Sequence, residues 1–155
     1  MRINKYTTRL NKDKVCELVK EKGVLYPEDG SLNTSEKIVK MMNYIYDMEN
    51  LPEEYVYLMC LNTQMKPLGI FEISHGTVNC SLLSPREIFI KALLCNASAI
   101  VVVHNHPSGE VIPSREDNLI TERIKEAGNI IGVSLIDHII IGDGTYYSFG
   151  KADTL

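Results

Sequence analysis

The chain has 155 residues, of which 45% are hydrophobic and 23% are charged, and its formal net charge is −4. This size suits one ordinary domain with a buried core, and the charge excludes a strongly basic protein that grips nucleic acid by bulk electrostatics. No apolar run approaches the roughly 20 residues of a membrane-spanning helix. The polar first residues also lack the apolar stretch of a secretory signal. We therefore expect a cytoplasmic protein with no membrane association.

The four cysteines (Cys16, Cys60, Cys80 and Cys95) are widely spaced and form no Cys-x-x-Cys pair. Cys60 and Cys95 lie among apolar neighbours, where a thiol behaves as a small hydrophobic group. We therefore expect neither a four-cysteine zinc site nor a disulfide framework. Cys80 and Ser81 have the chemistry of nucleophiles, but the local sequence places no base beside them.

An amphipathic pattern predicts a short N-terminal helix. Over residues 11–22, apolar side chains recur near one helical face, namely Val15, Leu18 and Val19. Gly23 follows as a helix stop. We therefore divide the chain into a short helical extension, residues 1–30, and a main domain, residues 31–155.

The main domain begins with a second predicted helix and a β-hairpin. Apolar residues recur at helical spacing over residues 33–48, and Pro52 prevents the helix from continuing. The segment 54–61 (EYVYLMCL) is aromatic and β-branched in its first half, which predicts a strand. Residues 69–76 (GIFEISHG) predict the returning strand of a hairpin.

The segment SPREIFIKALLCNA begins with a helix signature. Ser84 is the expected N-cap, Pro85 takes the first helical position, and Glu87 would complete a capping box. Residues 98–103 (SAIVVV) are a continuous apolar run, as in a strand that is covered on both faces.

The last third of the chain predicts a helix and a terminal hairpin. The helix fits residues 115–127, with Gly128 as its end, and the hairpin pairs residues 133–142 with 145–149 across an Asp-Gly turn. Strands and helices are thus interleaved along the chain. This order predicts an α/β fold with a mixed central β-sheet flanked by helices.

Two histidines stand at the end of the buried strand. His104 and His106 are two residues apart, and side chains at this spacing on a strand point to the same face. Pro107 and Gly109 end the strand and let the backbone turn. Both imidazoles are therefore expected to converge just past the strand end, where α/β sheets commonly bind ligands.

Asp117 lies in the first turn of the next predicted helix, and its carboxylate returns toward the strand end if the loop over residues 107–113 is compact. Two histidines and one carboxylate leave a fourth tetrahedral position for water, which is the ligand count of a catalytic zinc. Two structural alternatives stay open. The histidine rings can hydrogen-bond in a crevice without a metal, and Ser114 and Asp117 can form a helix capping box.

The complete pattern, HNHPSGEVIPSREDNLI, resembles the JAMM motif of the MPN/JAB metallopeptidases and specifically their RadC-like branch. SPREIFIKALLCNASAIVVVHNHPSG and SLIDHIIIGDGTYYSF resemble the same branch, so the similarity covers about residues 33–150. The resemblance implies a JAB/MPN (cytidine-deaminase-like) architecture and one Zn²⁺ held by His104, His106 and Asp117. It also implies a hydrolase in which a zinc-activated water attacks a peptide or isopeptide carbonyl.

The resemblance also implies roles for residues around the metal. Ser114 stands where the family is thought to hold the tetrahedral intermediate. The general base is a glutamate at the start of the first hairpin strand, which here is Glu54; its neighbour Glu53 and the mid-hairpin Glu72 stay open as alternatives. His138 is either a satisfied structural histidine or a residue that supports a metal ligand.

Two further functions are open. RadC relatives are associated with DNA repair, but the first 30 residues are not strongly basic, and the net charge does not support DNA as a partner. MPN domains that lack the metal ligands serve as interaction scaffolds, whereas the ligands are present here. The expected partner is a peptide or protein substrate, and neither its identity nor the oligomeric state follows from the sequence.

Overall fold

The computed structural model describes residues 1–76, 83–152 and 155. Its centre is a five-stranded sheet, with strands β5 (Tyr55–Leu61), β6 (Pro67–His75), β7 (Ala99–Asn105), β8 (Ser134–Ile141) and β9 (Tyr146–Ser148). The order across the sheet is β6-β5-β7-β8-β9. β7 and β8 are parallel, and the other neighbouring strands are antiparallel. The predicted mixed α/β sheet is therefore confirmed.

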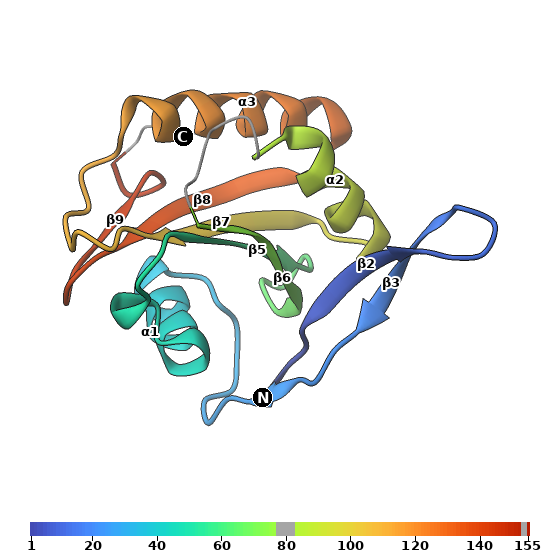
Figure 1. Cartoon of the computed structure of the whole chain (residues 1–155), viewed down its shortest axis with the longest axis horizontal. Coiled ribbons are helices and arrows are strands. Elements are labelled where there is room, and N and C mark those ends of the chain that lie inside the picture. Colours follow the sequence, from blue (N-terminus) through green and yellow to red (C-terminus); the bar gives the residue numbers. More distant parts are fainter. Residues whose placement is uncertain (77–82, 153–154) are drawn as a thin grey trace.

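Helices cover both faces of this sheet (Figure 1). They are α1 (Ser35–Tyr46), the short 3-10 helix η1 (Met48–Asn50), α2 (Pro85–Leu94) and α3 (Arg115–Ile131). α1 packs on one face, and α2 and α3 pack on the other. Within the described part of the chain, no helix combines the length and apolar character that crossing a membrane requires.

Strand β7 lies between the two hydrophobic cores, and all of its residues are buried. Val101 and Val103 belong to the core under α1. Ile100 and Val102 belong to the core under α2 and α3. The strand therefore needs apolar side chains on both faces, which explains the continuous apolar run in its sequence.

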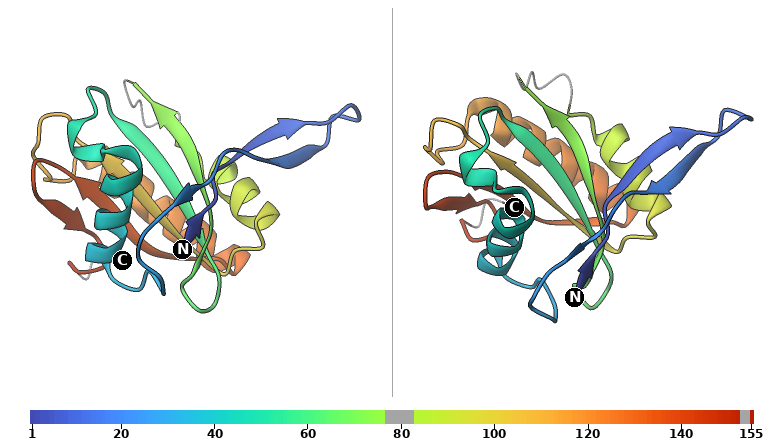
Figure 2. Two further views of the ribbon diagram at one scale, coloured as in Figure 1. Left: turned by 90° about the horizontal axis from the view of Figure 1, so that it is seen from below. Right: turned by 60° about the horizontal axis from the view of Figure 1, so that its bottom comes forward.

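The N-terminal segment is built from strands, so the helix predicted over residues 11–22 is wrong. The strands are β1 (Arg2–Ile3), β2 (Tyr6–Leu10), β3 (Cys16–Lys20) and β4 (Val24–Leu25). β2 and β3 form an antiparallel hairpin that projects from the body of the protein (Figure 2). β1 pairs with β4.

A tight turn between β2 and β3 explains this difference. The Asn11 side chain accepts hydrogen bonds from the backbone N–H groups of Asp13 and Val15, at 2.9 and 3.0 Å. Lys14 adopts a left-handed conformation with φ 63°. Side-chain and backbone geometry of this kind favours a turn over a helix. The division of the chain near residue 30 remains a prediction.

Helix α3 is longer than predicted, because Gly128 lies inside it and not at its end. The helix continues to Ile131 and ends at Gly132, which has φ 82°. A Cβ on Gly128 would lie 2.5 Å from the Val133 carbonyl oxygen and 3.3 Å from the Phe89 ring. This glycine therefore provides room for close packing instead of a helix stop.

Helix α2 starts where predicted, with Ser84 as N-cap and Pro85 in the first turn, but the predicted capping box is wrong. The Ser84 side chain makes no capping hydrogen bond. The carboxylate of Glu87 instead pairs with Arg86 at 3.0 Å and with Lys91 at 3.7 Å. Competing basic partners thus draw Glu87 away from the helix N-terminus.

Candidate metal centre

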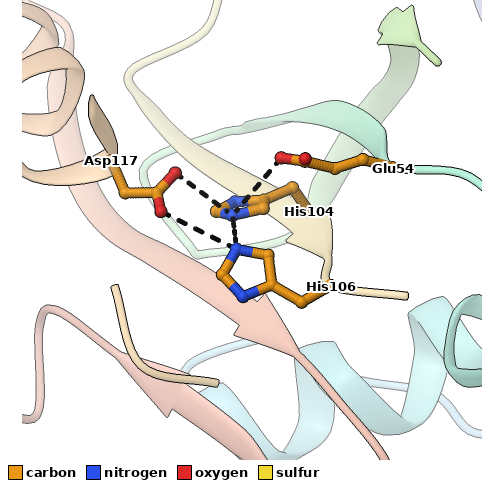
Figure 3. Close-up of side chains that lie close together, drawn as sticks. All are labelled: Glu54, His104, His106 and Asp117. Atoms are coloured by element: carbon orange, nitrogen blue, oxygen red, sulfur yellow. Dashed lines mark hydrogen bonds and ion pairs between the residues drawn. The ribbon is translucent and has the colours of Figure 1, made fainter. Parts of the chain in front are cut away.

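Four side chains converge at the C-terminal end of β7 (Figure 3). His104 lies on β7, His106 follows that strand, Asp117 lies in the first turn of α3, and Glu54 immediately precedes β5. One ligand atom from each residue lies within 4.8 Å of the others. The four side chains line a pocket of about 400 Å³, together with Val56, Leu83, Ser114, Glu116, Ile120 and His138.

The spacing of the histidine and aspartate atoms fits a zinc ion. Nε2 of His104 lies 3.1 Å from Nε2 of His106 and 3.3 Å from Oδ1 of Asp117. Nε2 of His106 lies 3.7 Å from Oδ2 of Asp117. Tetrahedral zinc with bonds of about 2.0–2.1 Å sets neighbouring ligand atoms roughly 3.3 Å apart. The donor set and its spacing are therefore compatible with zinc.

A chain of hydrogen bonds fixes the orientation of His104. The Thr121 hydroxyl donates to the Asp117 backbone carbonyl at 2.5 Å, so it must accept a proton from Nδ1 of His138, also at 2.5 Å. Nε2 of His138 is then unprotonated and accepts from Nδ1 of His104 at 2.9 Å. Nε2 of neutral His104 is left with a free lone pair that faces the site, as a metal ligand requires.

Burial agrees with this proton arrangement. His138 is 1% exposed, and burial lowers its pKa to about 4. Burial, with the neighbouring His138, also holds the pKa of His104 well below its usual range. Both rings are therefore neutral at pH 7, the state in which imidazole coordinates a metal.

His106 is oriented by the loop that follows it. Its Nδ1 lies 2.8 Å from the backbone carbonyl oxygen of Glu110, and a carbonyl only accepts, so Nδ1 carries a proton. Its Nε2 consequently points into the site with a lone pair whenever the ring is neutral. A hydrogen bond from the ring to Asp117 raises the pKa of His106, so metal and proton compete for this nitrogen.

Asp117 takes part in both the cluster and the helix cap. Its Oδ2 accepts hydrogen bonds from the backbone N–H and the hydroxyl of Ser114, at 2.7 and 2.6 Å, while Ser114 Oγ accepts from the Asp117 N–H at 3.0 Å. Burial opposes ionisation of Asp117, but the hydrogen bonds and the nearby histidines outweigh it and hold its pKa well below its usual range. Asp117 therefore forms the capping box and at the same time belongs to the cluster that could hold a metal ion.

Of the three candidate glutamates, the structure brings Glu54 into the cluster. Its Oε1 lies 3.9 Å from Nε2 of His104. Burial, reinforced by the charge of Asp117, raises the pKa of Glu54. The Glu72 carboxylate instead pairs with His75 at 2.7 Å on edge strand β6. Glu53 is exposed.

Residue Asn105, which sequence reasoning missed, holds Glu54 near the histidines. The Asn105 side chain accepts from the Tyr55 N–H at 2.8 Å and donates to the Glu53 carbonyl at 3.0 Å, and only 1% of the residue is exposed. It thus fixes the backbone on both sides of Glu54 against the end of β7. A polar residue between two candidate ligands was the only signal for this role in the sequence.

Ser114 lines the pocket, and its hydroxyl proton is directed to Asp117. The suggested nucleophiles Cys80 and Ser81 lie outside the described residues. The same holds for most of the loop between β6 and α2.

A family described as the RadC-like JAB domain matches residues 32–154. A UPF0758 protein of Thermotoga maritima is 48% identical over 117 residues, which cover 76% of this chain and 53% of the relative. The UPF0758 protein CD630_11440 of Clostridioides difficile is 48% identical over 106 residues, 68% of this chain and 45% of the relative. The chain thus spans about half the length of the curated relatives that it matches, and it belongs to the RadC-like JAB domain family.

Proposed function

We propose that this chain is a zinc-dependent hydrolase of the JAMM type that cleaves a peptide or isopeptide-like amide bond. The observation that carries this proposal is the convergence of two histidine Nε2 atoms and the Asp117 carboxylate at zinc-like spacing. The neighbouring carboxylate of Glu54, at 3.9 Å from His104, supports it.

Zinc in this site would supply Lewis acidity, polarising the amide carbonyl and lowering the pKa of a water to about 7. The carboxylate of Glu54 would take the proton of the attacking water and pass it to the leaving amine. Its raised pKa suits this exchange, because a carboxylate of ordinary pKa holds a proton too weakly. Val56 and Ile120 give the pocket an apolar wall that helps to exclude bulk water.

The test starts with the metal content of protein purified without chelator. We expect about one zinc per chain, and loss of zinc in the Asp117→Ala and His106→Ala variants. Glu116→Gln is the matched control, because Glu116 adjoins Asp117 and lines the same pocket but is not one of the four clustered residues. Undiminished zinc in both ligand variants would overturn the metal assignment.

Hydrolysis is tested separately with a library of peptides and of isopeptide-linked lysines. Glu54→Gln should retain zinc and lose about 10²–10⁴-fold in rate, the usual contribution of a general base. Glu53→Gln and Glu72→Gln are the controls and should keep the wild-type rate. A zinc-loaded protein that cleaves none of the library, yet retains a stable partner on pull-down, would favour a scaffold role instead.

Membership in the RadC-like family supports a second candidate function, an accessory role in DNA transactions. The net charge of −4 opposes this function. Fluorescence anisotropy with single- and double-stranded DNA at two salt concentrations distinguishes the two cases. Phosphate contact must weaken steeply with salt, so binding that is absent or independent of salt would exclude this role for the chain on its own.

A further inference from the structure

We propose that Cys60 and Cys95 form an oxidation-sensitive pair, which a peroxide converts into a disulfide between β5 and the end of α2. Both thiols are free in the structure. The pair lies in the core under α2 and α3, outside the metal pocket, and the proposal does not depend on zinc or on hydrolysis.

The sheet register places the Cys60 side chain beside the position that the Cys95 sulfur approaches. Gly69 on β6 is the direct cross-strand partner of Cys60 on β5, and side chains of such partners point to the same face of a sheet. A Cβ on Gly69 would lie 3.7 Å from Sγ of Cys95. The Tyr6 ring fills the space above Gly69, at 2.5 Å from that Cβ position, and Sγ of Cys95, the C-cap of α2, lies beside the ring on the face of the sheet that carries Cys60.

The two thiols interact directly and differ in accessibility. The interaction between the two thiols lowers the pKa of Cys95 and, together with burial, raises the pKa of Cys60. Cys60 is fully buried, whereas Cys95 is partly exposed. The thiolate is the nucleophile in thiol oxidation, and it forms more readily at the accessible sulfur of lower pKa. Cys95 is therefore the residue that meets the oxidant, and Cys60 is the resolving thiol.

The reaction balances with hydrogen peroxide as the oxidant. The Cys95 thiolate attacks one peroxide oxygen and breaks the O–O bond, which gives a sulfenic acid and releases hydroxide. The sulfur of Cys60 then attacks the sulfur of Cys95, the S–O bond breaks, and the departing hydroxide takes the Cys60 proton to form water. Two thiols are oxidised to one disulfide, and one peroxide is reduced to two waters. Cysteine pairs that cycle in this way are the usual form of disulfide in cytosolic proteins.

The test treats the 155-residue chain, as purified, with hydrogen peroxide, blocks free thiols under denaturing conditions and maps peptides by mass spectrometry. We expect a peptide pair joined through Cys60 and Cys95, about 2 Da lighter than the two reduced peptides, which a reductant separates. Cys16 is the internal control, since it lies on the projecting hairpin opposite Leu10. Two free thiols at Cys60 and Cys95, or a disulfide from Cys95 to Cys16 or Cys80, would overturn the proposal.

Two variants test the order of events. In Cys60→Ala, oxidation should stop at a sulfenic acid on Cys95, which dimedone traps. In Cys95→Ala, Cys60 should stay reduced, because it is buried. Circular dichroism establishes that each variant is folded, and the mapping of the wild-type protein requires neither variant. Dimedone labelling of Cys60 in folded Cys95→Ala at the wild-type rate would contradict the assigned order.

Discussion

His138 and His104 are joined ring to ring by a hydrogen bond of 2.9 Å between Nε2 of His138 and Nδ1 of His104. His138 is in turn held by the Thr121 hydroxyl, which donates to the backbone of Asp117. One proposed ligand is thus connected through two buried side chains to the helix turn that carries another. His138, a lone histidine in an apolar strand, therefore orients the ring of His104.

The hydrogen bonds that join Thr121, His138 and His104 predict that Thr121 affects zinc binding without contacting the metal. Thr121→Val removes the acceptor for His138 Nδ1 and keeps the shape of the side chain. Loss of such a supporting contact typically weakens metal affinity about 10–100-fold, measured here by competition with a chromophoric chelator. Thr121→Ser keeps the hydroxyl and serves as the control. Equal zinc affinity in the valine and serine variants would contradict the proposed network.

Asp117 takes part both in the helix cap and in the proposed metal site. We predict that variants can remove the cap without removing zinc binding. Ser114→Ala removes the N-cap side chain and should lower the free energy of unfolding of the zinc-free protein by about 1 kcal/mol. The ligands stay in place, so zinc stoichiometry should not change. Asp117→Ala should lose both the cap partner and the metal. Denaturant titration and metal analysis on the same samples make the comparison, and loss of zinc in Ser114→Ala would show that cap and ligand act as one unit.

Local spacing was enough to predict the histidine pair, because strand geometry alone brings His104 and His106 to one face. The position of Glu54 depends instead on long-range pairing. Val56 is the cross-strand partner of His104, and the Asn105 side chain closes the gap between the two strands. The residue pattern of the β5 segment does not reveal how this strand pairs with β7. The family resemblance was therefore needed to favour Glu54 over Glu53.

The two misread elements have separate physical causes. Apolar residues over 11–22 fit a helical face, but the side chain of Asn11 and the left-handed Lys14 make a turn that converts them into a hairpin. Glycine is a residue type that commonly ends helices, which is why the helix was predicted to end at Gly128. The carbonyl oxygen of Val133 instead lies where a side chain of residue 128 would be. In the first case a local turn overrides the helical pattern, and in the second a backbone contact just beyond the helix decides the role of the glycine.

Gly128 provides a stability prediction whose sign is unusual. Glycine to alanine inside a helix normally stabilises by about 1 kcal/mol. At this position the new Cβ would lie 2.5 Å from the Val133 carbonyl oxygen, and overpacking costs about 1–3 kcal/mol. Gly128→Ala should therefore lower the free energy of unfolding. Asn129→Ala, at an exposed position of the same helix, should be neutral or stabilising, and a stabilised Gly128→Ala would contradict the packing argument.

The buried histidines predict a pH dependence for the zinc-free protein. His138 has its pKa lowered by burial from 6.5 to about 4, and the pKa of His104 is lowered as well. Between these values the unfolded chain binds protons that the folded chain excludes, so stability falls as pH falls from about 6.5 toward 4. His106 and Glu54, whose pKa values are raised, oppose this trend.

With three lowered pKa values (His104, His138 and Asp117) against two raised ones (His106 and Glu54), the net slope should keep that sign and not exceed about 4 kcal/mol per pH unit. Denaturant titrations in chelator at several pH values measure it, and an NMR titration of the ring resonances assigns the contribution of His138. Zinc at saturating concentration should oppose the loss, because coordination holds His104 and His106 unprotonated. A zinc-free protein that becomes more stable on acidification over this range would contradict the neutral histidine chain.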